Sequence, residues 1–417
     1  MSYFNVDPSV YSTAATNLNQ YGTDFHTVFQ AQMTALSDTK DMGGTVGDCG
    51  LWATSYDTTT SEAYGLASSL VQAIDNYAGI LQQAGYNYAV ADYKPGTGRS
   101  EPTAPAELPM AWSTCPIPPP SAGGPGSGLV DDGFELASQA GVPIPDGDPD
   151  KLLKAADLWD ALAKHDSVAG LPAKLEAIAT GFIAVTTPEA SFIDEDLREM
   201  KTAAEDVRDI FADIAQSCRD QKVAIDDLRS QLKTLLEDLA EDIAQEVAVT
   251  VVFSAVAGAL SAGFGAAAVA AYRVGKIAIK VKSYATKIKN IVDNVKLLNK
   301  IVKKKDTATT QQKLQRIVDL VKRARQLGTP TRPSHVPEGW EARIADNGKG
   351  WVWQKPGSVK NQNMFRDALP TDDYPNGYVR FYNEQGQPIK LDGKPGSKAD
   401  THIPKNPDGT YPTPEGW

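Results

Sequence analysis

Apolar residues recur in alternating steps of three and four through much of the first 327 positions of this 417-residue chain, and the pattern stops at Gly328. That spacing places side chains on one stripe of an α-helix. It occurs twice within residues 1–94, on either side of a glycine-rich break, which predicts an antiparallel helical hairpin. The two stripes are Tyr11, Ala14, Leu18, Tyr21, Phe25 and Val28, followed by Ala63, Leu66, Leu70, Ile74, Tyr77, Leu81 and Ala84. We expect them to leave apolar surface for a partner helix or for the next module.

Composition divides the rest of the chain into three segments. Residues 95–149 are rich in proline and glycine, which predicts a linker. Residues 150–327 keep the helical period and form a predicted helical domain, in which Cys218 is a small core residue. Residues 328–417 hold eleven glycines and ten aromatic residues, and the runs 351–353 and 378–382 predict strands between turns. The expected fold is therefore multidomain, with an all-α hairpin and helical middle region followed by a small α+β, mostly β, C-terminal domain.

Charge is distributed unevenly although the net charge is only −11. Residues 1–272 hold 14 basic and 38 acidic residues, residues 273–325 hold 16 and 3, and the remainder holds 11 of each. The first block ends in 26 consecutive uncharged residues, 247–272. Two interpretations of this apolar segment stay open. It is either a buried alanine-rich hairpin whose basic neighbour docks on the acidic helix 194–246, or a segment that makes a transient membrane contact.

Several classes of protein are excluded or disfavoured by composition. Three widely spaced cysteines do not form a disulfide framework or a cysteine-based zinc signature. The four histidines are not spaced as metal ligands on a helix, and no nucleotide-binding or hydrolase motif occurs. We therefore expect no cofactor and no metal. The N-terminus lacks the basic and apolar stretches of a cleavable signal peptide.

The first 94 residues resemble the helical hairpins exported by actinobacterial type VII, or ESX-like, secretion systems. Trp52-Ala53-Thr54 lies in the interhelical turn where that family has Trp-x-Gly, although the glycine is missing here. Tyr88-Ala89-Val90-Ala91-Asp92 fits the family's Tyr-x-x-x-Asp/Glu export signal. The resemblance implies that Trp52, Tyr88 and Asp92 direct export without a cleavable signal peptide. It further implies recognition by a secretion ATPase and pairing of residues 1–94 with a small helical hairpin protein.

The order of an export hairpin, a helical middle and a distinct tip resembles a polymorphic toxin used in interbacterial competition. Residues 374–383 and Thr401-His402-Ile403-Pro404 resemble toxin domains of the barnase-, colicin- and RelE-like ribonucleases, over about residues 338–417. The resemblance implies an RNA substrate, with tRNA favoured, and action in the cytoplasm of a target cell. It also implies a cognate immunity protein.

Metal-independent RNA cleavage requires a base or acid and cations around the phosphate. We assign His402, as the only histidine expected in the folded part of the tip, to general acid–base catalysis. Arg380 is predicted to share one strand face with Tyr378 and Tyr382, which supplies a phosphate contact between base-stacking rings. Arg366 and Lys355 are further catalytic cations, and Asn363 and Thr401 are assigned to substrate binding.

Alternatives remain open at this point. His402 could instead hydrogen-bond a neighbouring loop, and a shift of one residue would turn Tyr378 and Tyr382 toward a core. We interpret the adjacent pair 372–373 as turn residues, since neighbours on a strand point apart. The alternative functions are a metal-dependent DNase toxin and a non-enzymatic secreted effector that acts at membranes through 247–272.

Overall fold

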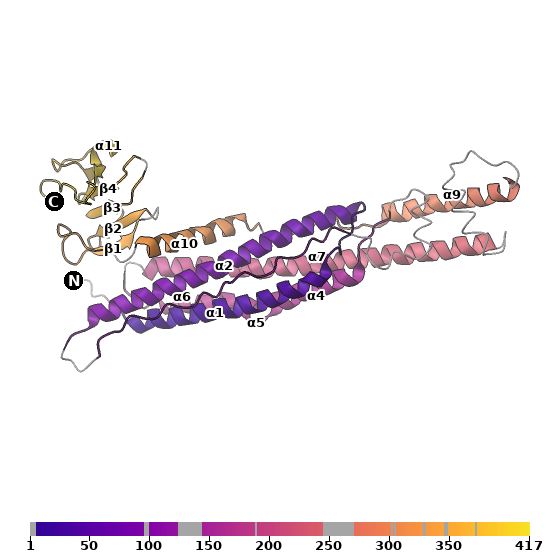
Figure 1. The fold of residues 1–417 in the computed structure, drawn as a ribbon, viewed down its shortest axis with the longest axis horizontal. Helices are drawn as coiled ribbons and strands as arrows, with labels where there is room; N and C mark the ends of the chain where they lie inside the picture. The colour runs from indigo at the N-terminus through magenta and orange to yellow at the C-terminus, as the bar shows by residue number, and fades with distance from the viewer. Residues whose placement is uncertain are drawn as a thin grey trace.

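The computed structural model describes residues 6–95, 100–123, 144–187, 190–244, 271–301, 303, 306–327, 331–345, 349–371 and 373–417. A long helical bundle precedes a small antiparallel sheet, as the sequence predicts (Figure 1). Among the described helices, none combines the length and the apolar character needed to cross a bilayer. The uncharged segment 247–272 lies outside the described residues, apart from its last two positions.

The predicted N-terminal hairpin is confirmed by two long helices that pack along each other. Helix α1 (Pro8–Ala35) begins where the Asp7 carboxylate accepts a hydrogen bond from the Ser9 backbone N–H at 2.9 Å, and Pro8 occupies the first turn. A short 3₁₀ helix, η1 (Leu36–Thr39), leads to the turn before α2 (Asp48–Asp92). The apolar stripes of both helices are buried in one core.

Helices from the middle of the chain cover the apolar surface that the hairpin leaves. These helices are α4 (Pro149–Lys164), α5 (Asp166–Ala169), α6 (Leu171–Gly181), α7 (Ala190–Ala244) and α10 (Ala308–Leu327). Trp52 is fully buried and its indole N–H donates to Ser217 Oγ of α7 at 3.1 Å. The Trp159 indole of α4 donates to the Tyr56 hydroxyl at 2.9 Å. The next module of the same chain therefore packs on the hairpin.

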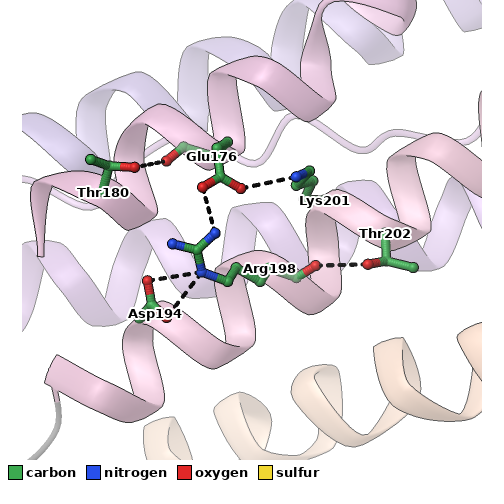
Figure 2. Close-up of polar contacts among 6 residues, drawn as sticks. All are labelled: Glu176, Thr180, Asp194, Arg198, Lys201 and Thr202. Atoms are coloured by element: carbon green, nitrogen blue, oxygen red, sulfur yellow. Dashed lines mark hydrogen bonds and ion pairs between the residues drawn. The ribbon is translucent and has the colours of Figure 1, made fainter. Parts of the chain in front are cut away.

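A network of partly exposed ion pairs joins α6 to the start of α7 (Figure 2). Arg198 bridges Glu176 of α6 and Asp194 of α7, with its Nε 3.0 Å from Asp194 Oδ2, and Lys201 Nζ lies 3.0 Å from Glu176 Oε2. The hydrogen bonds from Lys201 and Arg198 lower the pKa of Glu176. Exposed pairs of this kind each contribute at most about 1 kcal/mol, so the network fixes orientation more than it adds stability.

Helix α9 (Ala271–Asn294) lies beside the C-terminal part of α7, beyond the rest of the bundle (Figure 1). The Tyr284 hydroxyl of α9 donates to Asp242 Oδ2 of α7 at 2.8 Å. Desolvation, together with this carboxylate, raises the pKa of Tyr284 to about 12. The first part of the basic segment thus docks on the acidic helix, as the first interpretation of this region predicts.

Residues 331–417 contain a six-stranded antiparallel sheet, in which the predicted strands 351–353 and 378–382 are confirmed. The strands are β1 (Glu341–Ile344), β2 (Gly350–Gln354), β3 (Met364–Ala368), β4 (Tyr378–Tyr382), β5 (Pro388–Ile389) and β6 (Ile403–Pro404), with the short helix α11 (Lys398–Thr401) before β6. The first five follow chain order across the sheet, and β6 pairs with β4. Gly350 has a φ of +127°, and a Cβ there would lie 2.0 Å from the Asp367 carbonyl oxygen, so β2 can begin only with glycine.

Candidate active site

Strand β4 separates two faces of the C-terminal sheet. Val379 and Phe381 enter an aromatic core, whereas Tyr378 and Arg380 are half-buried on the opposite side. The aromatic core comprises Val336, Trp353, Phe365, Val379, Phe381, Ile389 and Ile403, with Trp340, Trp351, Tyr411 and Trp417 packed against it. The predicted strand register is therefore the one observed. We call the side that carries Arg366, Tyr378, Arg380 and His402 the basic face.

Two arginines lie directly opposite each other on the basic face. Arg366 of β3 and Arg380 of β4 are cross-strand partners in the antiparallel register. Such like-charged pairs oppose folding, and they are expected where two cations serve a bound anion. Arg380 Nη2 donates to Thr401 Oγ1 at 3.2 Å, and no carboxylate among the described residues forms an ion pair with Arg380. This arrangement leaves a guanidinium charge that a phosphate can neutralise.

His402 is held beside these arginines by the pairing of β6 with β4. Tyr378 pairs with Pro404 and Val379 with Ile403. The next position in this register brings His402 next to Arg380. Before it, α11 is fixed by a capping box between Ser397 and Asp400. The His402 ring stacks on Tyr378, with centroids 4.2 Å apart, and meets the edge of Tyr374 at 5.6 Å.

The surroundings of His402 keep its imidazole neutral. Desolvation, followed by the positive charges of Arg380, Lys398 and Arg366, lowers the pKa of His402 to about 4. At neutral pH the ring therefore carries one N–H and one free lone pair. A neutral imidazole can accept a proton from a substrate hydroxyl. An anion bound between the arginines would remove part of the charge that depresses its pKa.

The structure brings together five of the residues that the sequence assigned to the tip. Arg366, Tyr378, Arg380, Thr401 and His402 share the basic face or border it. Thr401 is fully buried, and its role is to contact Arg380. Tyr374 and Lys398 are the site residues that sequence inspection missed. The available signal was the run from Tyr374 to Tyr378, whose turn folds the two rings to 4.9 Å from each other.

Three other predicted residues are placed differently. Tyr382 is only 5% exposed and packs with Val352 and Met364, while the Arg380 guanidinium lies over its ring at 5.1 Å. Tyr382 therefore supports the Arg380 side chain, and its buried ring is not accessible for stacking with a base. Lys355 follows β2 and Asn363 precedes β3, and the Lys355 N–H donates to the Asn363 carbonyl at 3.1 Å. Both residues lie at the end of the sheet away from Tyr378. Asn363 also pairs with Asn383, about 17 Å along the sheet from Tyr378 at roughly 3.3 Å per residue.

The expectation that His402 is the only histidine in the folded part of the tip was wrong. His335 packs on the aromatic core, with its ring 4.8 Å from Phe365 and 5.5 Å from Tyr411. Burial lowers the pKa of His335, and its Nε2 is enclosed without a hydrogen-bond partner among the described residues. It lies on the face opposite His402.

The residues assigned to export lie on α2, so the expectation that Trp52 lies in the interhelical turn was wrong. Trp52 is buried in the bundle core near the N-terminal end of the helix, whereas Asp92 is exposed at its last position. Tyr88 is half-buried, and its ring lies 5.3 Å from that of Tyr11. Tyr88 therefore belongs partly to the core of the hairpin, although it lies one turn before Asp92 on the same helix.

No group of three or more His, Cys, Asp or Glu side chains is placed to hold a metal ion within the described part of the chain. No family model, no curated protein and no solved structure matches the chain. The candidate site therefore rests on the chemistry and the geometry of its own residues.

Proposed function

We propose that the C-terminal region, 331–417, is the ribonuclease effector of a secreted antibacterial toxin and cleaves RNA without a metal ion. The observation that carries this proposal is a neutral imidazole, His402, beside a cross-strand pair of arginines and two tyrosine rings. Each of these groups has a task in phosphodiester transesterification. RNA is favoured because its 2′-hydroxyl supplies the nucleophile.

In the proposed reaction, Arg366 and Arg380 bind the scissile phosphate. His402 takes the proton of the 2′-hydroxyl as the oxygen attacks phosphorus. The bond from phosphorus to the 5′ oxygen breaks, that oxygen takes up a proton from water, and a 2′,3′-cyclic phosphate forms. The arginines stabilise the added negative charge of the transition state. Tyr374 offers a ring beside His402 on which an unpaired base can stack.

The test uses the purified full-length chain with total bacterial RNA in excess EDTA. We expect cleavage, most of all of tRNA, and products that end in 2′,3′-cyclic phosphate. His402→Ala should lower the rate by about 10²–10⁴-fold, the range for loss of a general base. Cleavage that EDTA abolishes, or cleavage of DNA with RNA intact, would instead support a metal-dependent DNase.

We further propose that residues 1–94 serve in export by a type VII system. The exposed carboxylate of Asp92 and the half-buried phenol of Tyr88, one helical turn apart, form the surface offered to the secretion ATPase. The chain would then act in the cytoplasm of a target cell, and the producing cell would need an immunity protein. An acidic inhibitor that covers the basic face has the complementary charge.

A further inference from the structure

Residues 106–121, part of the predicted linker, lie along α1 and α2 without regular secondary structure; we call them the strap (Figure 1). Side chains of the hairpin bind the main chain of the strap. Asp75 Oδ2 accepts hydrogen bonds from the N–H groups of Ala111 and Trp112 at 3.0 and 3.1 Å. His26 Nε2 lies 2.9 Å from the Ser113 carbonyl oxygen.

The same pattern continues toward both ends of the strap. Asn19 Nδ2 donates to the Pro109 carbonyl at 2.7 Å, and the Tyr64 hydroxyl donates to the Cys115 carbonyl at 3.0 Å. Peptide-binding grooves usually bind the main chain of an extended peptide and provide pockets for only some of the peptide's side chains.

Two polar side chains of the hairpin are buried beneath the strap. His26 and Asp75 are each only 5% exposed, although they lie on otherwise apolar helix faces. A buried carboxylate is costly unless hydrogen-bond donors surround it, and here backbone N–H groups of the strap supply two. Gly22 faces Ala111 of the strap, and a Cβ on Gly22 would lie 3.4 Å from the Ala111 Cβ, so the helix and the strap approach each other closely here.

One large side chain of the strap anchors it in an aromatic slot. The Trp112 ring lies 4.9 Å from His26, 5.9 Å from Tyr64 and 6.0 Å from Phe29. Met110 and Ile117, by contrast, are 60% and 71% exposed. Cys115 and Ser121 are buried, at 4% and 1% exposed. The groove therefore selects the backbone course, the tryptophan and these two small side chains, and it leaves most other side chains of the ligand unconstrained.

We propose that the α1–α2 face formed by Asn19, Gly22, His26, Tyr64 and Asp75 is a peptide-binding groove that the strap fills in cis. Its ligand class is an extended, proline-flanked peptide with a tryptophan that follows a small residue. The prolines of the strap have no N–H to donate and favour an extended course. The strap is therefore held by hydrogen bonds between hairpin side chains and its main chain, and not by the backbone hydrogen bonds of a β-sheet. A partner protein that presents such a segment binds by displacing the strap.

The experiment measures binding of a fluorescent peptide of residues 106–121 to the full chain. Wild type should bind weakly because its groove is filled. Trp112→Ala, which loosens the strap, should bind the peptide at least tenfold more tightly. Adding Asp75→Asn to that variant should abolish the gain, whereas Asp24→Asn, at a partly exposed α1 carboxylate that accepts a hydrogen bond from Gln20, should preserve it. A folded Trp112→Ala chain that does not bind, or equal binding by the Asp75→Asn double variant, overturns the proposal.

A second measurement covers the case in which Trp112→Ala fails to fold. Specific protease sites inserted after Gly96 and after Gly126 of the otherwise wild-type chain allow the strap to be excised from the folded protein. Exchange of the excised strap for the labelled peptide, but not for a scrambled one, supports the groove. Loss of the helical circular dichroism signal on cleavage, or a strap that never exchanges, shows a purely structural element and overturns the proposal.

Discussion

The ring of His402 stacks on the ring of Tyr378, with centroids 4.2 Å apart and planes inclined by 28°. This contact desolvates the imidazole on one side, while Arg380 and Arg366 add positive charge nearby. Both effects disfavour the protonated ring, and they make the state of His402 sensitive to any anion that the arginines bind.

The first prediction concerns the pH dependence of stability. The pKa of His402 is about 4 in the folded chain, against 6.5 for an ordinary histidine. Between these values the unfolded chain binds a proton that the folded chain does not, so stability is full above pH 6.5 and falls as the pH drops toward 4. Urea unfolding of the C-terminal region, followed by tryptophan fluorescence, should show this loss. His402→Asn should reduce it, and an unchanged pH profile in that variant would contradict the assignment.

The second prediction concerns inorganic phosphate. An anion held by Arg366 and Arg380 should raise the pKa of His402, because it offsets the guanidinium charges. A proton NMR titration of the His402 ring should therefore move upward from about pH 4 when phosphate is added. His335, on the opposite face, provides the internal control and should keep its titration. Equal shifts of both rings would indicate an ionic-strength effect and no bound phosphate.

The third prediction separates the basic face from the far end of the sheet. Arg380→Lys should reduce RNA cleavage at least tenfold, because an ammonium does not reproduce the forked contact of a guanidinium with phosphate. Lys355→Ala removes a cation near Asn363, far from His402, and should leave the rate within about twofold. Initial rates on purified tRNA, with folding checked by circular dichroism, test both. A larger loss in Lys355→Ala than in Arg380→Lys would place the substrate elsewhere.

The fourth prediction concerns the core contact of Trp52. Trp52→Ala should destabilise the bundle by about 3–5 kcal/mol, the usual range for removing a buried large aromatic side chain. Trp52→Phe should cost less, although it loses the hydrogen bond to Ser217. Leu51→Ala, at a neighbour that is 59% exposed, is the matched control and should change stability little. Urea unfolding by helical circular dichroism measures all three, and a stable Trp52→Ala chain would be the contrary result.

The fifth prediction concerns export. Asp92→Ala should block secretion from a cell with an active type VII system and leave thermal unfolding unchanged, because Asp92 is exposed at the end of α2. Tyr88→Ala should also block secretion, but at some cost in stability, since its ring packs against Tyr11. Asn87→Ala, at an exposed neighbour, should be exported normally. Normal secretion of Asp92→Ala would refute the proposed signal.

The helices and the two main strands could be predicted because their patterns are local. A buried stripe on α1 or α2 repeats with the helical period, and the alternation along β4 follows from a strand that has different surroundings on its two faces. The choice between the two faces of β4 was open in the sequence. The burial of Val379 and Phe381 resolves it, because the aromatic rings that cover them come from segments distant in the chain.

The candidate site was only partly predictable for the same reason. Arg380, Arg366 and His402 could be named as residue types, but their proximity depends on the register of β3 with β4 and on the pairing of β6. Lys355 and Asn363 have equally suitable chemistry and lie at the wrong end of the strands. His335 was not counted in the folded part of the tip, yet its ring contacts the core.

The sequence by itself determined where helices give way to strands, since period, turn dipeptides and glycine content act over a few residues. Only the tertiary structure decided what covers each surface. Proline and glycine content marked residues 95–149 as a linker, but within it residues 106–121 contact Asn19, His26, Tyr64 and Asp75, which lie between 36 and 90 positions away. Contacts at such separations depend on how the helices pack, because a side chain on one helix meets a distant segment only after the bundle has formed.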